Sequence, residues 1–168
     1  YWQKDNSRKL PGQSQQNLFG GKQEEEKLPD LAISIKPRFA KLILEGKKTV
    51  ELRKTFSREH EGKKALFYVS QPVGCFAFTA NIGDVYQGHT DQLWKSYGEQ
   101  TGVKKDQFEA YFDDRRTGYA VRLESVRPLQ PPISLGEMRE KRCEIPIPQS
   151  YMALDKRNKF LTLVSEKL

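Results

Sequence analysis

The chain has few of the residues that form covalent cross-links or bind transition metals. Its 168 residues include two cysteines and two histidines. Cys75 stands in an apolar stretch, where a thiol behaves as a small hydrophobe. No signal peptide is visible, so we expect Cys75 and Cys143 to be reduced and the protein to be cytoplasmic. Neither His60 nor His89 has a second ligand at metal-binding spacing, and we predict no metal site.

Other absences exclude further classes of protein. No apolar run approaches the roughly 18 residues that span a bilayer, so we expect no membrane partner. The chain has neither Gly-x-x-x-x-Gly-Lys-Ser/Thr nor Gly-x-Gly-x-x-Gly, the loops that hold nucleotide phosphates. No serine, cysteine or histidine stands in a context that resembles a nucleophile elbow. We therefore expect no bound cofactor.

The first 30 residues contain few large apolar side chains and many Gln, Lys, Glu, Gly and Asn. Such a stretch buries too little apolar surface to offset the entropy lost on ordering. We expect residues 1–30 to be a polar linker or tail and residues 31–168 to be one domain. Because the chain begins with Tyr1 rather than Met, we expect the tail to follow an upstream domain.

The net charge of +7 is concentrated in one part of the chain. Residues 36–64 hold ten Lys and Arg against four Glu, a local excess of +6. Clustered cations neutralise phosphates and release counterions, so this segment favours a polyanion partner. RNA, a nucleotide and DNA all present phosphate, and a solvated basic surface is the alternative reading.

Hydrophobic periodicity predicts short strands interrupted by short helices. We expect strands over 31–36, 48–54, 65–69, 75–85, 117–126 and 160–164. We expect helices after Pro37, over about 90–98 and 104–112, and after Ser134, with an irregular segment over 146–154. Several connections are too short for parallel crossovers, so the pattern predicts an α+β barrel of five or six mostly antiparallel strands with short peripheral helices.

The candidate functional side chains are concentrated in one octet. Residues 46–53 read Gly-Lys-Lys-Thr-Val-Glu-Leu-Arg and enter a strand from a glycine turn. Alternation puts Thr49, Glu51 and Arg53 on one face, and Lys48 lies close enough to the turn to bend round to them. An exposed or buried ion pair would be structural. If these residues have a functional role, Lys48 and Arg53 would hold phosphate or Arg53 would stack on a base. Glu51 would then accept a hydrogen bond from a base N–H, or take up a proton.

The octet fits Gly-x-Lys-x-x-Glu-x-Arg and resembles the signature of the ASCH domain, a PUA-like β-barrel family tied to RNA. Ser34 to Pro37, Tyr68 to Ser70, Pro72 to Gly74 and Pro148 to Tyr151 also occur in the family's order. The resemblance covers about residues 31–154 and is closest to a prokaryotic group of predicted regulators. It implies a cleft in the side of the barrel that binds RNA or a nucleotide. The implied cleft residues are Lys36, Lys48, Glu51, Arg53, Ser70, Gln149 and Tyr151.

The resemblance also implies alternatives to a binding module. One branch of the family cleaves single-stranded RNA, for which Glu51 and Lys48 would be the catalytic residues. Another hydrolyses N4-acetylcytidine with a threonine at the position of Glu51; Thr49 is a poor substitute for it, and Glu99 would supply a later carboxylate. A reader of modified DNA bases would need an aromatic cage. Trp94 is the only tryptophan in residues 31–168, and the aromatic residues near it fit a core, so this alternative ranks lowest.

Overall fold

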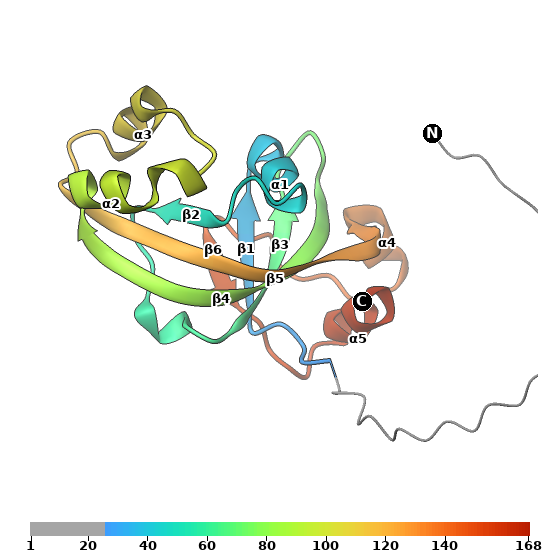
Figure 1. Ribbon diagram of the computed structural model, residues 1–168. Helices are drawn as coiled ribbons and strands as arrows, with labels where there is room; N and C mark the ends of the chain where they lie inside the picture. Colours follow the sequence, from blue (N-terminus) through green and yellow to red (C-terminus); the bar gives the residue numbers. More distant parts are fainter. Residues whose placement is uncertain (1–25) are drawn as a thin grey trace, which may run out of the picture.

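The computed structural model describes residues 26–168. Six strands form one sheet in the order β2-β5-β4-β3-β1-β6 (Figure 1). The strands are β1 (Leu31–Ile35), β2 (Val50–Arg53), β3 (Lys64–Val69), β4 (Cys75–His89), β5 (Thr117–Ser134) and β6 (Tyr151–Ala153). The helices are α1 (Pro37–Leu44), α2 (Thr90–Tyr97), α3 (Lys105–Phe112), α4 (Leu135–Glu140) and α5 (Lys159–Lys167), with 3₁₀ turns η1 (Arg58–His60) and η2 (Gly98–Gln100).

The sheet is mostly antiparallel, with one parallel pair between β1 and β3. Its long central strands β4 and β5 bend through register shifts, one of them between Ile82 and Val85 around Gly83. Such irregularities increase local twist and bend a strand. The sheet therefore curls into a half-barrel whose edges are β2 and β6 (Figure 1). These features confirm the predicted α+β fold of five or six mostly antiparallel strands with short peripheral helices. The strand β6 lies in the segment 146–154, which was expected to be irregular.

The first helix follows from local sequence. Pro37 occupies the first turn of α1, where its missing N–H costs nothing. Gly46 adopts φ 72° just after the helix, a conformation that glycine reaches without steric penalty. The chain then turns directly into β2, on which Val50 and Leu52 are buried. The predicted alternation of the octet is thus confirmed.

The expected final strand over 160–164 is wrong, because these residues lie in α5. Asn158 caps the helix by accepting a hydrogen bond from the N–H of Phe160 at 2.9 Å. Phe160, Leu161 and Val164 then fall at helical spacing and are buried. A short run of apolar residues fits the hydrophobic periodicity of a helix as well as that of a strand. The asparagine cap is the signal that favours the helix.

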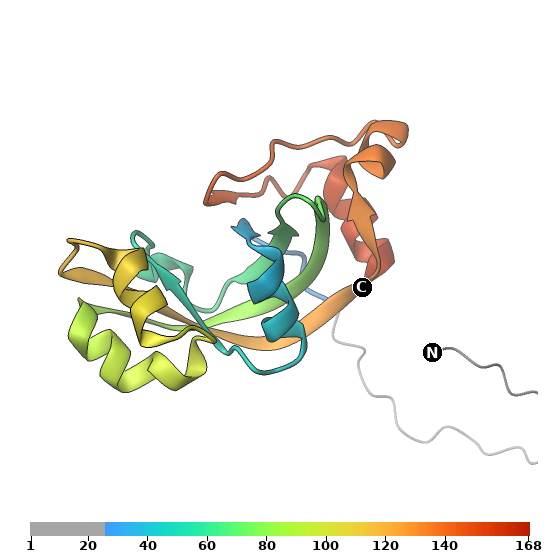
Figure 2. The same cartoon turned by 90° about the horizontal axis from the view of Figure 1, so that it is seen from above.

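Three hydrophobic clusters hold the half-barrel together. The largest lies on one face of the sheet and includes Phe67 and Phe78, whose rings stack at 4.7 Å, with Ala40 and Ile43 of α1. A second lies under α4 and α5, and a third joins β2 to α2 and α3. Viewed from above, α2 and α3 stand at one end of the sheet and α4 and α5 at the other (Figure 2). No helix within residues 26–168 is long and apolar enough to cross a membrane.

Candidate functional site

A pocket of about 190 Å³ lies where the end of β1 and the start of α1 meet β2 and α3. One part of its wall is charged and the other is apolar, as in ligand sites where a few polar groups fix the orientation of the ligand. The lining residues are Ser34, Ile35, Lys36, Arg38, Phe39, Lys48, Glu51, Leu52, Arg53, Val103, Gln107, Phe108 and Tyr111. The structure thus brings together four of the predicted site residues, Lys36, Lys48, Glu51 and Arg53.

The carboxylate of Glu51 lies between two cations. Its Oε2 is 3.2 Å from the Nζ of Lys48, and its Oε1 is 3.4 Å from the Nε of Arg53. The three side chains are 12%, 2% and 11% exposed, respectively. Because all three are largely removed from water, their attraction is screened less than that of a surface pair. Lys48 has bent round to the face of Glu51, as its place beside the turn predicts.

The ammonium of Lys48 is held by two backbone carbonyls and one carboxylate. It donates to the main-chain carbonyls of Val50 at 2.8 Å and Thr101 at 2.7 Å, and its third direction is taken by Glu51. Two of its three donors are thus used on backbone carbonyls, and the ammonium faces the carboxylate of Glu51 as an ion pair. The contact with Thr101 also ties the segment before α3 to the octet. Lys48 therefore positions Glu51 and one wall of the pocket.

Two atoms of this group are buried without a hydrogen bond in the described part of the chain, Glu51 Oε2 and Arg53 Nε. Their ion contacts fall within 3.4 Å but lack hydrogen-bond geometry. A buried acceptor and a buried donor without partners are costly to the folded protein.

Arg53 also joins distant segments of the half-barrel. Its Nη2 donates to the main-chain carbonyl of Ser34 at 2.7 Å, and its Nη1 donates to the hydroxyl of Ser150 at 3.3 Å. The guanidinium thus reaches from the edge strand β2 to the end of β1 and to the segment before β6. Ser34 and Ser150 lie in segments that carry the family resemblance, but they were not among the implied cleft residues. Ser34 is contacted through its main-chain carbonyl, which no side-chain pattern encodes.

The wall formed by α3 is attached to the outer edge of β2. The hydroxyl of Tyr111 donates to the carbonyl of Leu52 at 3.3 Å and accepts from the N–H of Lys54 at 3.2 Å. Arg115 donates to the carbonyl of Lys54 at 3.3 Å. Burial raises the pKa of Tyr111, so its hydroxyl remains a donor at neutral pH. On the same helix Phe108 is buried in the core, whereas Tyr111 is 40% exposed.

The other predicted site residues lie outside the pocket wall. Ser70 follows β3 and donates its N–H to the carbonyl of Ile35 at 2.9 Å, beside the pocket. Gln149 is exposed next to Ser150. Tyr151 packs against the rings of Phe56 and His60 at centroid distances of 4.9 and 5.3 Å. Burial, with the nearby charge of Lys63, lowers the pKa of His60 and keeps this aromatic cluster uncharged at neutral pH.

Phe39 and Arg38 are among the lining residues that the sequence analysis missed. Neither was among the implied cleft residues. The guanidinium of Arg38 lies 4.4 Å from the ring centroid of Phe39, at the pocket wall. Arg38 directly follows Pro37 and so lies in the first turn of α1. Its positive charge belongs to the same basic segment as the octet, and this is the sequence signal that could have identified it.

Residues required by the alternative chemistries are not in the pocket wall. Thr49 is exposed and donates its N–H to the carbonyl of Gln100 at 3.0 Å. Glu99 is exposed on η2. Trp94 packs on Phe108 at 5.1 Å on the side of a different hollow. In residues 26–168, no group of three or more His, Cys, Asp or Glu side chains is placed to hold a metal ion.

A curled α+β half-barrel with a charged and aromatic pocket beside one edge strand defines a protein of the PUA-like class. Residues 32–153 match the family described as "Domain of unknown function (DUF365)". The chain is 30% identical over 139 residues to the "ASCH domain-containing ribonuclease" of Zymomonas mobilis subsp. mobilis, covering 82% of this chain and 93% of that protein. The chain belongs to the ASCH domain family, as the octet predicted.

Solved structures agree with this assignment. The crystal structure of ASCH from Zymomonas mobilis superimposes with a TM-score of 0.71 at 30% identity, over 79% of this chain and 92% of that chain. A serine-to-alanine mutant of the same protein gives a TM-score of 0.73 over 84% of this chain and 100% of that chain. The fold is therefore shared over almost the whole length of the relative.

Proposed function

We propose that this protein binds single-stranded RNA at the pocket beside β2 and cleaves it. The observation that carries the proposal is the carboxylate of Glu51 held between Lys48 and Arg53 at 3.2 and 3.4 Å. A general base and cations beside the reacting phosphate are the groups that phosphodiester cleavage needs. The proposal is supported by the relative named a ribonuclease, 93% of which is covered by the match to this chain.

The phosphate contacts come from the cations that the fold leaves available. Lys36 and Arg38 line the pocket and are exposed, and no ion pair joins either of them to another described residue. Arg53 lines the same pocket, and its side chain is 11% exposed. A guanidinium presents several donors in a fixed plane and suits phosphate oxygens. The phosphate therefore binds between Arg38 and Arg53, while Lys48 holds Glu51.

The reaction uses the ribose 2′-hydroxyl as the nucleophile. Glu51 takes the proton of this hydroxyl, and the 2′-oxygen forms a bond to phosphorus. The bond from phosphorus to the 5′-oxygen breaks, and the ammonium of Lys36 gives a proton to that leaving oxygen. One product ends in a 2′,3′-cyclic phosphate and the other begins with a 5′-hydroxyl. Arg53 and Arg38 stabilise the additional negative charge in the transition state.

The proposal is tested with one single-stranded RNA and the same oligonucleotide carrying a 2′-deoxy sugar at the cleaved position. The RNA is cut to a 2′,3′-cyclic phosphate, and the deoxy oligonucleotide remains intact but still binds. Glu51→Gln lowers the cleavage rate by about 10² to 10⁴ while RNA affinity changes little, because only proton transfer is lost. Glu59→Gln, which changes an exposed carboxylate on η1, is the matched control and retains the native rate.

Two results would contradict the proposal. Equal cutting of the RNA and of the deoxy oligonucleotide would mean that water, not the 2′-hydroxyl, is the nucleophile. If wild type and Glu51→Gln bind the RNA with the same affinity and neither cleaves it, the protein is an RNA-binding module and not a ribonuclease. Single-stranded DNA is the weaker ligand, because it offers phosphates but no 2′-hydroxyl to Glu51.

A cytoplasmic location is part of this proposal. Cys75 and Cys143 are both free thiols in the structure, which supports a reducing compartment. Labelling of the unreduced protein, taken directly from cells, would find two reactive thiols after unfolding. One disulfide-linked pair would contradict this location.

A further inference from the structure

A second cluster of charges surrounds a buried lysine at the opposite end of β1 and β3 from the pocket. Lys64 begins β3, and its side chain is 10% exposed. A buried ammonium is costly unless an anion or several acceptors face it. Its partner among the described residues is Glu26, whose Oε1 lies 2.9 Å from the Nζ of Lys64. The fold thus builds a position that requires a negative charge.

The same carboxylate is shared with a second cation. Arg127 on β5 forms an ion pair with Oε2 of Glu26, and it also donates to the main-chain carbonyl of Leu168. The two oxygens of Glu26 are thereby divided between an ammonium and a guanidinium. This is the arrangement in which two oxygens of a phosphate would be held. The site is therefore shaped for an oxyanion rather than for a single charge.

Glu26 belongs to a short segment without regular structure that precedes β1. Its side chain is 30% exposed, three times the exposure of the lysine that it covers. The lysine is fixed by its strand, whereas the carboxylate is supplied by a connecting segment. An anion from outside could therefore replace the carboxylate without disturbing the sheet.

The surrounding hollow is much larger than a carboxylate requires. Its volume is about 570 Å³, and it is open to solvent. Asn81 and Ser125, both exposed, add neutral donors to its wall. Two other charged residues line it. Lys27 pairs with Asp30 at 3.5 Å, and Glu124 is an exposed carboxylate near Gly83. The walls leave room for a tetrahedral anion beside Lys64 and Arg127.

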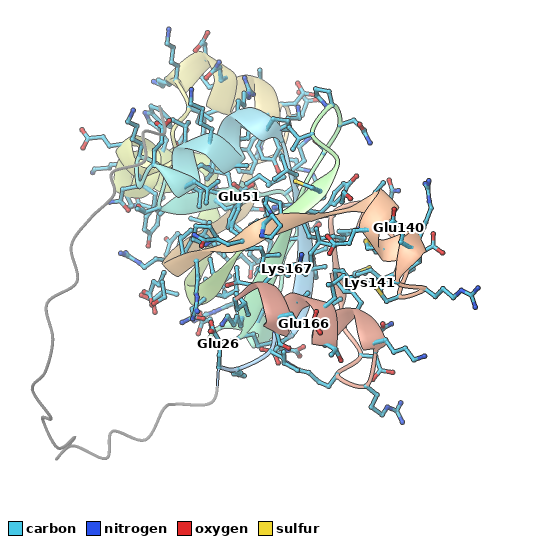
Figure 3. The ribbon with its side chains drawn as sticks, turned by 90° about the vertical axis from the view of Figure 1, so that its right-hand side faces the viewer. Glu26, Glu51, Glu140, Lys141, Glu166 and Lys167 are labelled. Carbon is cyan, nitrogen blue, oxygen red and sulfur yellow. The ribbon has the colours of Figure 1, made fainter. Side chains whose placement is uncertain are left out.

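This cluster is separate from the pocket at Glu51. Figure 3 shows Glu26 and Glu51 well apart in the molecule. The five residues of β1 that separate the two places span about 16 Å, because a strand rises about 3.3 Å per residue. An anion at Lys64 therefore does not compete with one at Arg53.

We propose that Lys64 and Arg127 form a second anion site, for a phosphate group, which Glu26 occupies as an internal competitor. The phosphate is that of a free phosphate compound or of an RNA strand, which carry the same oxyanion. Removal of the Glu26 charge empties the site for this ligand. The inference is independent of the proposed RNA cleavage, since none of its residues lies in the pocket at Glu51.

The test compares the full chain with Glu26→Gln, which keeps the size of the side chain and removes its charge. Thermal unfolding is followed in sodium phosphate and in sodium chloride at equal ionic strength. The Tm of Glu26→Gln rises about 2–4 °C more with phosphate than that of the wild type does, because the ligand stabilises the folded state only where the site is free. Each variant is compared with itself, so a lower starting Tm does not obscure the result.

The control adds Arg127→Gln to Glu26→Gln. Arg127 is about half exposed, so this double variant folds, and it loses the extra response to phosphate. An equal response in wild type and in Glu26→Gln, or an unchanged response in the double variant, would overturn the proposal. Titration with single-stranded RNA separates the two sources. Tighter RNA binding by Glu26→Gln assigns the site to an RNA phosphate, and unchanged RNA binding assigns it to a free phosphate compound.

Discussion

The guanidinium of Arg53 donates a hydrogen bond of 2.7 Å to the main-chain carbonyl of Ser34, and this contact crosses the open side of the half-barrel. Arg53 lies on β2 at one edge of the sheet, whereas Ser34 lies on β1, next to the other edge. The two strands are not paired by backbone hydrogen bonds. The side chain of Arg53 therefore connects two strands that backbone hydrogen bonds would connect in a closed barrel. This connection lies within the candidate site.

This contact predicts that Arg53 serves both structure and binding. Arg53→Ala removes a charged hydrogen bond worth about 1.5–3 kcal/mol and lowers the free energy of unfolding by a similar amount. It also weakens RNA binding. Ser150→Ala, which loses only the 3.3 Å contact, costs less and is the matched control. Urea unfolding and RNA titration measure the two effects; a fully stable Arg53→Ala would show that the bridge is dispensable.

Lys48 is predicted to matter more for stability than its charge alone suggests. Lys48→Met leaves the carbonyls of Val50 and Thr101 and the carboxylate of Glu51 without their cation. Breaking a buried pair in this way costs about 3–5 kcal/mol. Lys47→Met changes a neighbouring lysine that is 68% exposed and costs less than about 0.5 kcal/mol. Equal unfolding midpoints for the two variants would contradict the positioning role of Lys48.

Asp30 predicts a dependence of stability on pH. Burial acts to raise its pKa, but hydrogen bonds from the N–H of Lys64 and the ammonium of Lys156 outweigh it and hold the pKa below the ordinary 3.8. A carboxyl whose pKa is lower in the folded state stabilises above its unfolded pKa and loses this contribution as pH falls through the folded value. Asp30→Asn therefore destabilises at pH 7, and the difference from wild type shrinks below about pH 4. A difference that is constant from pH 7 to pH 3 would rule out this origin.

The proposed division between tail and domain is tested by two deletions. Removal of residues 1–25 leaves Tm nearly unchanged, because that stretch is poor in large apolar side chains. Removal of residues 1–30 also takes away the ion pairs of Glu26 and Asp30 and the packing of Leu28 against the cluster under α5. This longer deletion lowers Tm clearly. If removal of residues 1–25 also lowers Tm strongly, the boundary between the tail and the domain lies earlier in the chain.

Most of the fold was available from local sequence signals. Pro37, Gly46 and the alternation of Val50 and Leu52 determine a helix, a turn and a strand through their own backbone preferences. The run 160–164 was misread because five apolar residues fit either period until the cap at Asn158 is weighed. The ends of β4 and β5 were placed too early for a related reason. These strands continue through polar, exposed positions at the rim of the sheet, where alternation is lost.

The candidate site was predictable only in part. Glu51, Arg53 and Lys48 are close in sequence, so strand parity brings them together. Tyr111 reaches them from a helix almost sixty residues later, and its hydroxyl binds backbone atoms, which leave no trace in the side-chain pattern. Ser70, Gln149 and Tyr151 were expected in the cleft from resemblance alone, and the pocket wall does not include them.

The attachment of α3 to β2 has a consequence for self-association. An open sheet exposes unpaired backbone groups at its edges, and such edges recruit strands from other molecules into aggregates or swapped dimers. At β2 the carbonyls of Leu52 and Lys54 and the N–H of Lys54 are already bonded to Tyr111 and Arg115. At the other edge, β6 has three residues, too few to template a long partner. The half-barrel therefore remains open toward its ligand and closed to addition of further strands.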